Sequence, residues 1–291
     1  MAGSARISCR LWGDAMDSFS LQVQSVSPAP GGATKTAIMD YSTAATKAEL
    51  TTNRFDSPAK LTFTVLEQNG ISISEGSSVE LTVDGIHMFK GYIFTAEQNR
   101  DGEVAYTAYD QLRYLKANAS YTFEVMTLGQ IIQQIAADFG LVCGTLEDTG
   151  YAFPCLIKEN TSCLDIIFDA LAETIYMTGK IYVFYDNAGA LTLVEAKDMY
   201  SSTLIGDKSL ATDFTYKRDI DSETYNRIKL VRPNSETGRA DTYIAEDTET
   251  QAKWGLLQYY DQVDENLNAA QIEQMCEMYL QYYNRVVQEL S

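Results

Sequence analysis

The sequence predicts an α+β protein that is mainly β, and three observations lead to this fold class. Residues 1–113 carry apolar residues in the two-residue alternation of half-buried strands. Residues 114–200 contain two stretches with apolar residues at three- and four-residue steps, the spacing of amphipathic helices. Residues 201–291 return to strand patterns and end in a long helical segment. We therefore expect a first β domain over 1–113, an α+β insert over 114–200 and a second β domain with a C-terminal helix over 201–291.

The first domain is expected to be a sheet built from hairpins. Alternating apolar residues predict strands at Leu61–Val65, Val79–Val83, Met88–Phe94 and Glu103–Tyr109. The turn at Asp84-Gly85 joins the second of these strands to the third, because Asp-Gly favours the tight turn of a hairpin. A turn at Asn99–Gly102 precedes the fourth strand. The segment Ser25–Thr36 contains two prolines and two glycines and is predicted to be a loop within the domain.

The insert contains two helices with clear start and stop signals. Thr127 and Gln130 form a capping box ahead of the first helix, and Gly140 ends it in a left-handed conformation. The apolar face of this helix consists of Leu128, Ile131, Ile132, Ile135, Ala136 and Phe139. The second helix starts near Ser162, ends at Gly179 and has the apolar face Leu164, Ile167, Phe168, Leu171, Ala172 and Ile175. Two strands then form a hairpin, Ile181–Tyr185 and Leu191–Glu195.

The last third is predicted to hold two further strands, Asp213–Lys217 and Arg227–Val231, and a helix that Asn268 caps. One face of this helix is expected to carry Ile272, Met275, Cys276, Tyr279, Leu280, Tyr283, Val286 and Leu290. No low-complexity segment or internal repeat stands out.

The composition argues against several classes of protein. The net charge is −18, from 40 acidic and 22 basic residues, and basic residues cluster no further than pairs such as Lys217-Arg218. A nucleic-acid binder needs clustered cations to displace counterions from phosphates, so we expect no direct nucleic-acid binding. No apolar run approaches the ~18 residues of a membrane span, and residues 1–9 do not resemble a targeting segment. The 19 tyrosines are typical of half-buried sheets and subunit contacts.

The motifs of common enzymes and metal sites are absent from the sequence. There is no GxSxG, HExxH, P-loop or GxGxxG motif, and the single histidine, His87, is expected to be exposed in a turn. Asp110 is expected to be a helix N-cap. The nearest calcium-loop match begins at Asp219 but has Thr224 where glycine is needed and Leu230 where glutamate is needed. We therefore predict no catalytic, cofactor-binding or metal-binding residues, and no enzyme activity.

The five cysteines are not spaced as a disulfide framework or a zinc site. Their number is odd, no two form CxxC, and one histidine adds little to a ligand set. We expect reduced, mostly buried thiols at Cys9, Cys143, Cys155, Cys163 and Cys276.

Several stretches, in order along the chain, carry a resemblance to a known family. They are Asn53–Val65, Phe89–Phe94, Tyr109–Lys116, the helix Thr127–Gly140, Tyr225–Ile228, Lys253–Tyr260 and Asn268–Ile272. Together they resemble the hub proteins of prophage and defective-phage tails, similar to late control protein D, over about residues 50–285.

The resemblance implies a fold and a function. In that family two tube-like β-barrels flank small α/β domains, and three chains form a ring with sixfold outline that joins the hexameric tail tube to the trimeric central spike. The implied partners are two further copies of the chain, the tube protein, the spike, neighbouring baseplate or wedge proteins and the tape-measure protein. The implied location is a virion or phage-tail-like particle assembled in the host cytoplasm.

The length of the chain departs from the family pattern. The second barrel of the family continues with strands past the last helix, whereas this chain stops at Ser291. This departure is compatible with a shortened chain, a shorter natural variant or a barrel that closes differently, so we expect an incomplete second tube-like domain.

The sequence leaves two functions open besides the hub. A carbohydrate-binding module of a virion or cell surface is suggested by the tyrosines and sheets, and it would require exposed aromatic residues along a groove. A wall-degrading hydrolase would require a catalytic constellation, which the sequence does not offer. The sequence does not distinguish a phage that carries DNA from a headless bacteriocin-like tail.

Overall fold

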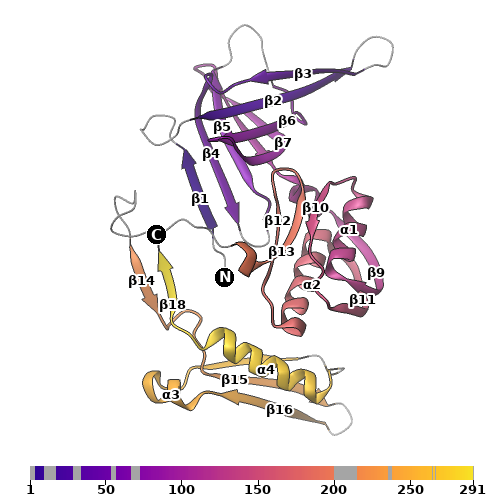
Figure 1. Ribbon diagram of the computed structural model, residues 1–291, viewed down its shortest axis with the longest axis vertical. Coiled ribbons are helices and arrows are strands. Elements are labelled where there is room, and N and C mark those ends of the chain that lie inside the picture. Colours follow the sequence, from indigo (N-terminus) through magenta and orange to yellow (C-terminus); the bar gives the residue numbers. More distant parts are fainter. Residues whose placement is uncertain are drawn as a thin grey trace. The chain divides into compact units, whose positions relative to one another are not determined.

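The computed structural model describes residues 4–9, 18–28, 34–53, 57–66, 73–199, 215–234, 238–263, 265 and 267–290. The chain divides into two compact units, an N-terminal unit over residues 1–200 and a C-terminal unit over residues 201–291 (Figure 1). Each unit is described by itself.

The N-terminal unit begins with an eight-stranded antiparallel sheet. Its strands are β1 Ser4–Cys9, β2 Phe19–Pro28, β3 Thr34–Asp40, β4 Ala45–Asn53, β5 Lys60–Leu66, β6 Ser78–Val83, β7 Ile86–Gln98 and β8 Glu103–Tyr109. Their order in the sheet is β1-β4-β5-β8-β7-β6-β2-β3. The edge strands β1 and β3 do not pair with each other, so the described strands form an open sheet and not a closed barrel.

The alternation in the sequence places one face of this sheet in a hydrophobic core. Leu61, Phe63 and Val65 of β5 are buried and lie opposite Ala108, Tyr106 and Val104 of β8. The four strands predicted in this region are confirmed. The predicted turn is confirmed as well, because Asp84 and Gly85 both adopt positive φ, at 50° and 78°, as a tight hairpin turn requires.

Two expectations for this domain were wrong. Most of the predicted loop Ser25–Thr36 is strand, because Ser25–Pro28 of β2 pairs with Thr34–Ala37 of β3. The backbone ladder therefore outweighs the local Pro and Gly signals, and residues 29–33 between the strands lie outside the described residues. His87 is exposed as predicted, but it lies within β7 and not in a turn.

The rest of the N-terminal unit is an α+β layer. Its elements are η1 Gln111–Lys116, β9 Asn118–Thr127, α1 Leu128–Asp138, β10 Cys143–Leu146, β11 Ala152–Ser162, α2 Cys163–Thr178, β12 Tyr182–Asp186, β13 Leu191–Glu195 and η2 Ala196–Met199. Strands β9 and β11 form a two-stranded antiparallel ribbon, and β10, β13 and β12 form a three-stranded sheet. Helices α1 and α2 pack together and lie between the ribbon and this sheet (Figure 1).

Both predicted helices and their caps are confirmed. Thr127 and Gln130 form the capping box of α1, Gly140 follows its end with φ +64°, Ser162 caps α2, and Gly179 ends α2 with φ +70°. The predicted face of α1 is buried except for Phe139, which is partly buried. The buried face of α2 is shifted from the predicted one, because α1, η1 and β11 all pack on the helix. The predicted Leu164, Ile167 and Leu171 are buried, but Phe168, Ala172 and Ile175 are only partly buried. Its additional buried residues include Ile166, Ala170 and Thr174.

The C-terminal unit combines a short ribbon with a helix-covered sheet. Its elements are β14 Tyr216–Asp219, β15 Arg227–Asn234, β16 Arg239–Glu246, α3 Thr248–Trp254, β17 Gln258–Gln262, α4 Ala269–Tyr283 and β18 Val287–Leu290. Strand β15 pairs with β16 in antiparallel and with β17 in parallel orientation, and α4 packs on β15 and β16. Strands β14 and β18 pair with each other, so residues 220–286 form an excursion between two neighbouring strands.

The expectations for this unit are confirmed in part. Asn268 caps α4 through a capping box with Gln271, and β15 covers the predicted strand Arg227–Val231. The predicted strand Asp213–Lys217 is described only from residue 215, and β14 begins at Tyr216. Val286 and Leu290 were wrongly assigned to the helix, which ends at Tyr283. The β-branched pair at 286–287 favours extended backbone, and β18 then pairs with β14.

Candidate assembly surface

The first candidate surface is the β2–β3 edge of the large sheet. Strand β6 pairs with β2 only over Phe19–Gln24, whereas β3 pairs with β2 over Gln22–Pro28. The outer half of the β2–β3 hairpin is therefore a two-stranded extension beyond the sheet (Figure 1). Ile38 on β3 is 66% exposed. An edge strand of this kind presents unpaired N–H and C=O groups to another chain.

The second candidate surface is the outer face of the β9–β11 ribbon. Phe123 and Phe153 point inward and are fully buried. Val125, two residues after Phe123, would point inward in a regular strand, but its φ of +52° turns it outward and leaves it 74% exposed. Ile157 on β11 is 61% exposed. A β-branched residue with positive φ is a strained conformation, and strain of this kind is found at functional positions.

The third candidate surface is the face of the β16–β15–β17 sheet opposite α4. Ile228 and Leu230 of β15 are fully buried, and α4 packs on the strand. Lys229 lies between them in sequence and therefore faces the other way, and its cross-strand partners are Ile244 and Tyr260. Ile244 is 46% and Tyr260 59% exposed. The side of this sheet away from α4 is thus an exposed face with an apolar centre.

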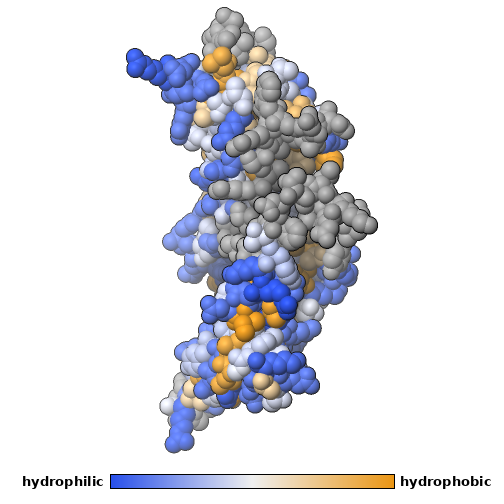
Figure 2. All heavy atoms as spheres, turned by 90° about the vertical axis from the view of Figure 1, so that its left-hand side faces the viewer, coloured by the Kyte–Doolittle hydropathy of each residue, from blue (hydrophilic) through white to orange (hydrophobic). Residues whose placement is uncertain are grey.

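Hydrophobic residues gather on one face of the C-terminal unit, as Figure 2 shows. The exposed large hydrophobic residues described for this unit are Tyr216, Ile244, Leu256 and Tyr260. Many of the other tyrosines pack on each other. Tyr259 has the rings of Tyr225 and Tyr283 within 5.4 Å of its centroid, and that of Tyr279 within 5.5 Å. The tyrosines that the sequence suggested as contact residues are therefore divided between core and surface.

A buried polar joint connects the large sheet to the α+β layer. Asp110 is only 3% exposed and caps η1, as the sequence predicted. Its Oδ1 accepts a hydrogen bond from the Leu112 amide at 3.0 Å and its Oδ2 from the Ala59 amide at 2.9 Å. Burial raises the pKa of Asp110 to about 8, although the two backbone donors oppose the rise.

The joint continues through Gln111 into the hairpin β12–β13. The Gln111 side chain donates to Asp186 Oδ2 at 2.9 Å and accepts from the Val142 amide at 2.8 Å. Asp186 Oδ1 accepts from the Gly189 amide at 2.6 Å. Burial raises the pKa of Asp186 as well. These carboxyl groups are occupied by donors from the fold itself, which is the arrangement of a structural network and not of a catalytic pair.

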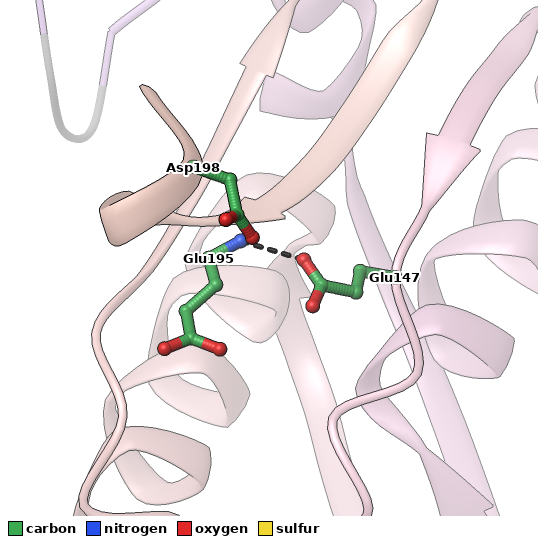
Figure 3. Close-up of side chains that lie close together, drawn as sticks. All are labelled: Glu147, Glu195 and Asp198. Carbon is green, nitrogen blue, oxygen red and sulfur yellow. Dashed lines mark hydrogen bonds between the residues drawn. The ribbon is translucent and has the colours of Figure 1, made fainter. Parts of the chain in front are cut away.

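Three acidic residues of the described chain come close enough together to be considered as a metal site, Glu147, Glu195 and Asp198 (Figure 3). The Glu147 carboxylate accepts a hydrogen bond from the Glu195 amide at 2.7 Å. Lys197 lies 2.6 Å and Lys180 3.6 Å from the Glu195 carboxylate. The hydrogen bond from Lys197 is the main reason that the pKa of Glu195 is lowered. Two lysines already supply the positive charge here, so the cluster is explained without a metal ion.

The remaining residues singled out from the sequence do not come together in a site. His87 Nδ1 lies 3.2 Å from the Thr82 hydroxyl on the surface. Asp219 accepts hydrogen bonds from the Asp221 amide and the Ser222 hydroxyl, and these bonds help lower its pKa to about 2. Of the described cysteines, Cys163 and Cys276 are buried, Cys143 is partly buried and Cys155 is exposed. Burial raises the pKa of the Cys163 thiol, which keeps it protonated.

The exposed positions of the second and third surfaces were missed from the sequence. Both lie on strands that were not predicted, β9, β11, β16 and β17. In these strands Thr, Glu, Asp and Gln stand between the apolar residues, so the alternation of apolar and polar residues is weak. The stretch Thr242–Ala245 carried a usable signal, because polar and apolar residues with high strand preference follow one another there.

Comparison with known proteins relates this architecture to phage tails. The family model described as YQBQ-like matches residues 48–291. The chain belongs to the YQBQ-like family. The uncharacterized protein YqbQ of Bacillus subtilis is 30% identical over 227 residues, which cover 76% of this chain and 68% of YqbQ. The phage-like element PBSX protein XkdQ of the same organism is 31% identical over 246 residues, which cover 82% of this chain and 74% of XkdQ.

Solved structures with the same fold as this YQBQ-like protein are prophage tail proteins. The 43 kDa tail protein of prophage MuSo2 from Shewanella oneidensis matches with a TM-score of 0.64 at 13% identity, over 91% of this chain and 80% of that one. The prophage tail protein gp18 of Listeria monocytogenes matches with a TM-score of 0.58 at 14% identity, over 91% and 78% of the two chains. At these identities the likeness concerns the fold. No described helix of this family member is long and apolar enough to cross a membrane.

Proposed function

We propose that this chain is a structural subunit of the central baseplate hub in a contractile, phage-type tail. The observation that carries the proposal is that the described strands form an open eight-stranded antiparallel sheet, with β1 and β3 as its edges, in a chain whose relatives include a protein of a phage-like element. A sheet with free edges is protected from non-specific pairing when the edges are covered, and a closed ring of copies covers them.

The ring is a trimer with sixfold outline, which joins the hexameric tail tube to the trimeric central spike. Residues 1–113 form the first tube-like domain, residues 114–200 the insert and residues 201–291 the second tube-like domain. The pairing of β14 with β18 supports this division, because these strands flank the excursion 220–286 as a sheet flanks an inserted module. In the proposed ring, three chains that each contribute two tube-like domains match a sixfold tube to a threefold spike.

The partners of the ring are the tube protein, the spike, neighbouring baseplate or wedge proteins and the tape-measure protein, within a virion or tail-like particle assembled in the host cytoplasm. Because each chain carries a charge of −18, a closed ring is strongly acidic. Such a ring repels DNA or an acidic tape-measure segment from its wall and so lets it slide past.

The chain has no enzyme activity of its own in this proposal. The buried carboxyl groups of Asp110 and Asp186 are held by backbone and amide donors, and Glu195 is paired with lysines. Turnover of cell-wall glycan or peptide by the purified chain, abolished by a single carboxylate substitution, would contradict this part of the proposal.

The symmetry of the protein inside an assembled tail tests the hub proposal. The gene is tagged in its parent element, tails are induced and purified, and the tag is located by electron cryomicroscopy. We expect three copies per tail on the axis, between tube and spike. Six copies, or a position at the periphery of the baseplate, would rule out the hub and leave another tail role.

A further inference from the structure

Two of the exposed surfaces described above match each other in chemistry. One is the second candidate surface, the outer face of the β9–β11 ribbon, which we call the ribbon face. Cross-strand pairing places Thr122 opposite Ile157 and Glu124 opposite Cys155 on this face, with Val125 beside them. Glu124 and Glu159 are exposed there, and no described cation forms an ion pair with either of them. The ribbon face is therefore apolar at its centre and acidic around it.

The other is the third candidate surface, the face of the β16–β15–β17 sheet opposite α4, which we call the open sheet face. Its central row is Ile244, Lys229 and Tyr260, and the Lys229 ammonium lies 5.9 Å from the centroid of the Tyr260 ring. Arg227 lies on the same face, 3.6 Å from Glu246. Among the described residues no carboxylate forms an ion pair with Lys229. The open sheet face is therefore apolar at its centre and carries more positive than negative charge.

A net positive face is unusual on a chain with a charge of −18, and it selects for an acidic partner surface. The chain itself offers such a surface, with apolar residues of similar size in its centre. Val125 strengthens the match, because its strained backbone and exposed apolar side chain both cost stability in the single chain, and a contact with a second copy would offset that cost.

We propose that the ribbon face of one copy docks on the open sheet face of a second copy. The contact is heterologous, since two different surfaces meet, and repetition of a heterologous contact generates a ring when the rotation closes. This inference rests on the proposed ring and adds a contact between its subunits to the covering of the sheet edges. Lys229 lies against Glu124 or Glu159 of the neighbour, while Ile244 and Tyr260 cover the neighbour's Val125 and Ile157.

The test is a charge swap on the full-length chain. Self-association is measured by sedimentation velocity over a concentration series at low and moderate salt. We expect the unmodified chain to associate and Lys229→Glu or Glu124→Lys alone to weaken association at least about tenfold, because like charges then face each other. The double variant Lys229→Glu with Glu124→Lys restores it. Lys253→Glu changes an exposed lysine on α3, outside the three strands of the open sheet face; it is the matched control and leaves association unchanged.

A second variant separates the contact from stability. Val125→Gly removes the apolar side chain and also fits the positive φ, so association should weaken without any loss of melting temperature. The inference is overturned if the unmodified chain stays monomeric throughout, if the double variant is no better than the single ones, or if Lys253→Glu acts as strongly. It is equally overturned if the single variants destabilise the monomer, which would indicate a contact within one chain. None of these results bears on the position of the protein in the tail, which the copy-number measurement decides.

Discussion

Replacement of Gly91 by alanine tests the close packing at the centre of the large sheet. Gly91 is buried in β7, next to the end of β8. A Cβ atom at this position would lie 2.3 Å from the Tyr109 carbonyl oxygen and 2.6 Å from the Phe89 ring. In close-packed protein interiors, a Cβ atom lies about 1 Å farther than this from its nearest neighbours. The Tyr109 carbonyl belongs to the backbone, so it cannot rotate away. Either the β7–β8 ladder shifts or the Phe89 ring leaves the core.

We expect Gly91→Ala to lower the free energy of unfolding by about 3 kcal/mol, the upper end of what overpacking costs. For a unit of this size that corresponds to a fall in melting temperature of roughly 6–12 °C. Differential scanning calorimetry of the full chain measures it, with the N-terminal unit followed separately by hydrogen exchange of the β7 and β8 amides.

Gly129→Ala is the matched control. Gly129 is also buried, but it lies in α1, where an added Cβ would meet its nearest neighbours at an ordinary 3.7 Å. Alanine is favoured over glycine in a helix, so the control should be neutral or more stable by up to about 1 kcal/mol. A Gly91→Ala protein within about 0.5 kcal/mol of the unmodified chain would show that the sheet is looser than its backbone geometry indicates.

Three further predictions concern the insert, the joint and the cysteines. Ile132→Asp should lower the free energy of unfolding by more than about 4 kcal/mol in a thermal melt, because Ile132 is fully buried. Phe168→Asp should lower it less, because Phe168 is only partly buried. If Ile132→Asp melts like the unmodified chain, the burial of Ile132 is contradicted. The folded-state pKa of Asp110 is about 8, above its unfolded value of about 4, so its protonated form favours folding. Stability should therefore fall as the pH rises from about 4 to about 8 and level off above that, and Asp110→Asn should flatten this dependence in melts at several pH values. Alkylation under denaturing conditions without reductant should label all five cysteines, and a native disulfide or bound zinc would contradict the reduced state that we expect.

The sequence predicted well those elements whose signal is local. The caps at Thr127, Ser162 and Asn268 and the turn at Asp84-Gly85 each satisfy backbone groups within a few residues, so the pattern alone identifies them. The sequence-based prediction failed where pairing with another strand decides the local structure. The predicted loop Ser25–Thr36 is largely strand because β2 and β3 complete each other's ladder. Val286 and Leu290 fit the helical spacing of α4, but β14, about seventy residues earlier in the chain, pairs with β18 instead.

The candidate surfaces were harder to predict, because they depend on exposure and not on residue type. Nothing in the residues around Val125 predicts its positive φ. The open sheet face likewise depends on which side α4 covers, and the helix could have packed on either face of an isolated three-stranded sheet. Without that choice, Ile244 and Lys229 cannot be assigned to core or surface.

Three of the stretches that carry the family resemblance meet at the joint between the large sheet and the insert. Ala59 from the first stretch and Asp110 from the third exchange hydrogen bonds, the Ala59 amide with the Asp110 carboxylate and the Asp110 amide with the Ala59 carbonyl. Gly91 from the second stretch permits the close approach of β7 to Tyr109, directly before Asp110. Three segments separated in the sequence thus meet around Tyr109 and Asp110.

Two further contacts extend this joint into the insert. Gln111 connects Asp110 to the β12–β13 hairpin through Asp186, and the Lys90 stem packs so closely on Gly189 that a Cβ there would lie 2.6 Å from it. The hairpin is therefore held to the sheet by polar contacts on one side and by the lysine stem on the other. The hub proposed above requires the large sheet and the insert to move together under load, and a joint of buried, hydrogen-bonded polar groups would provide that stiffness. Three of the stretches that carry the family resemblance thus help to connect the large sheet to the insert.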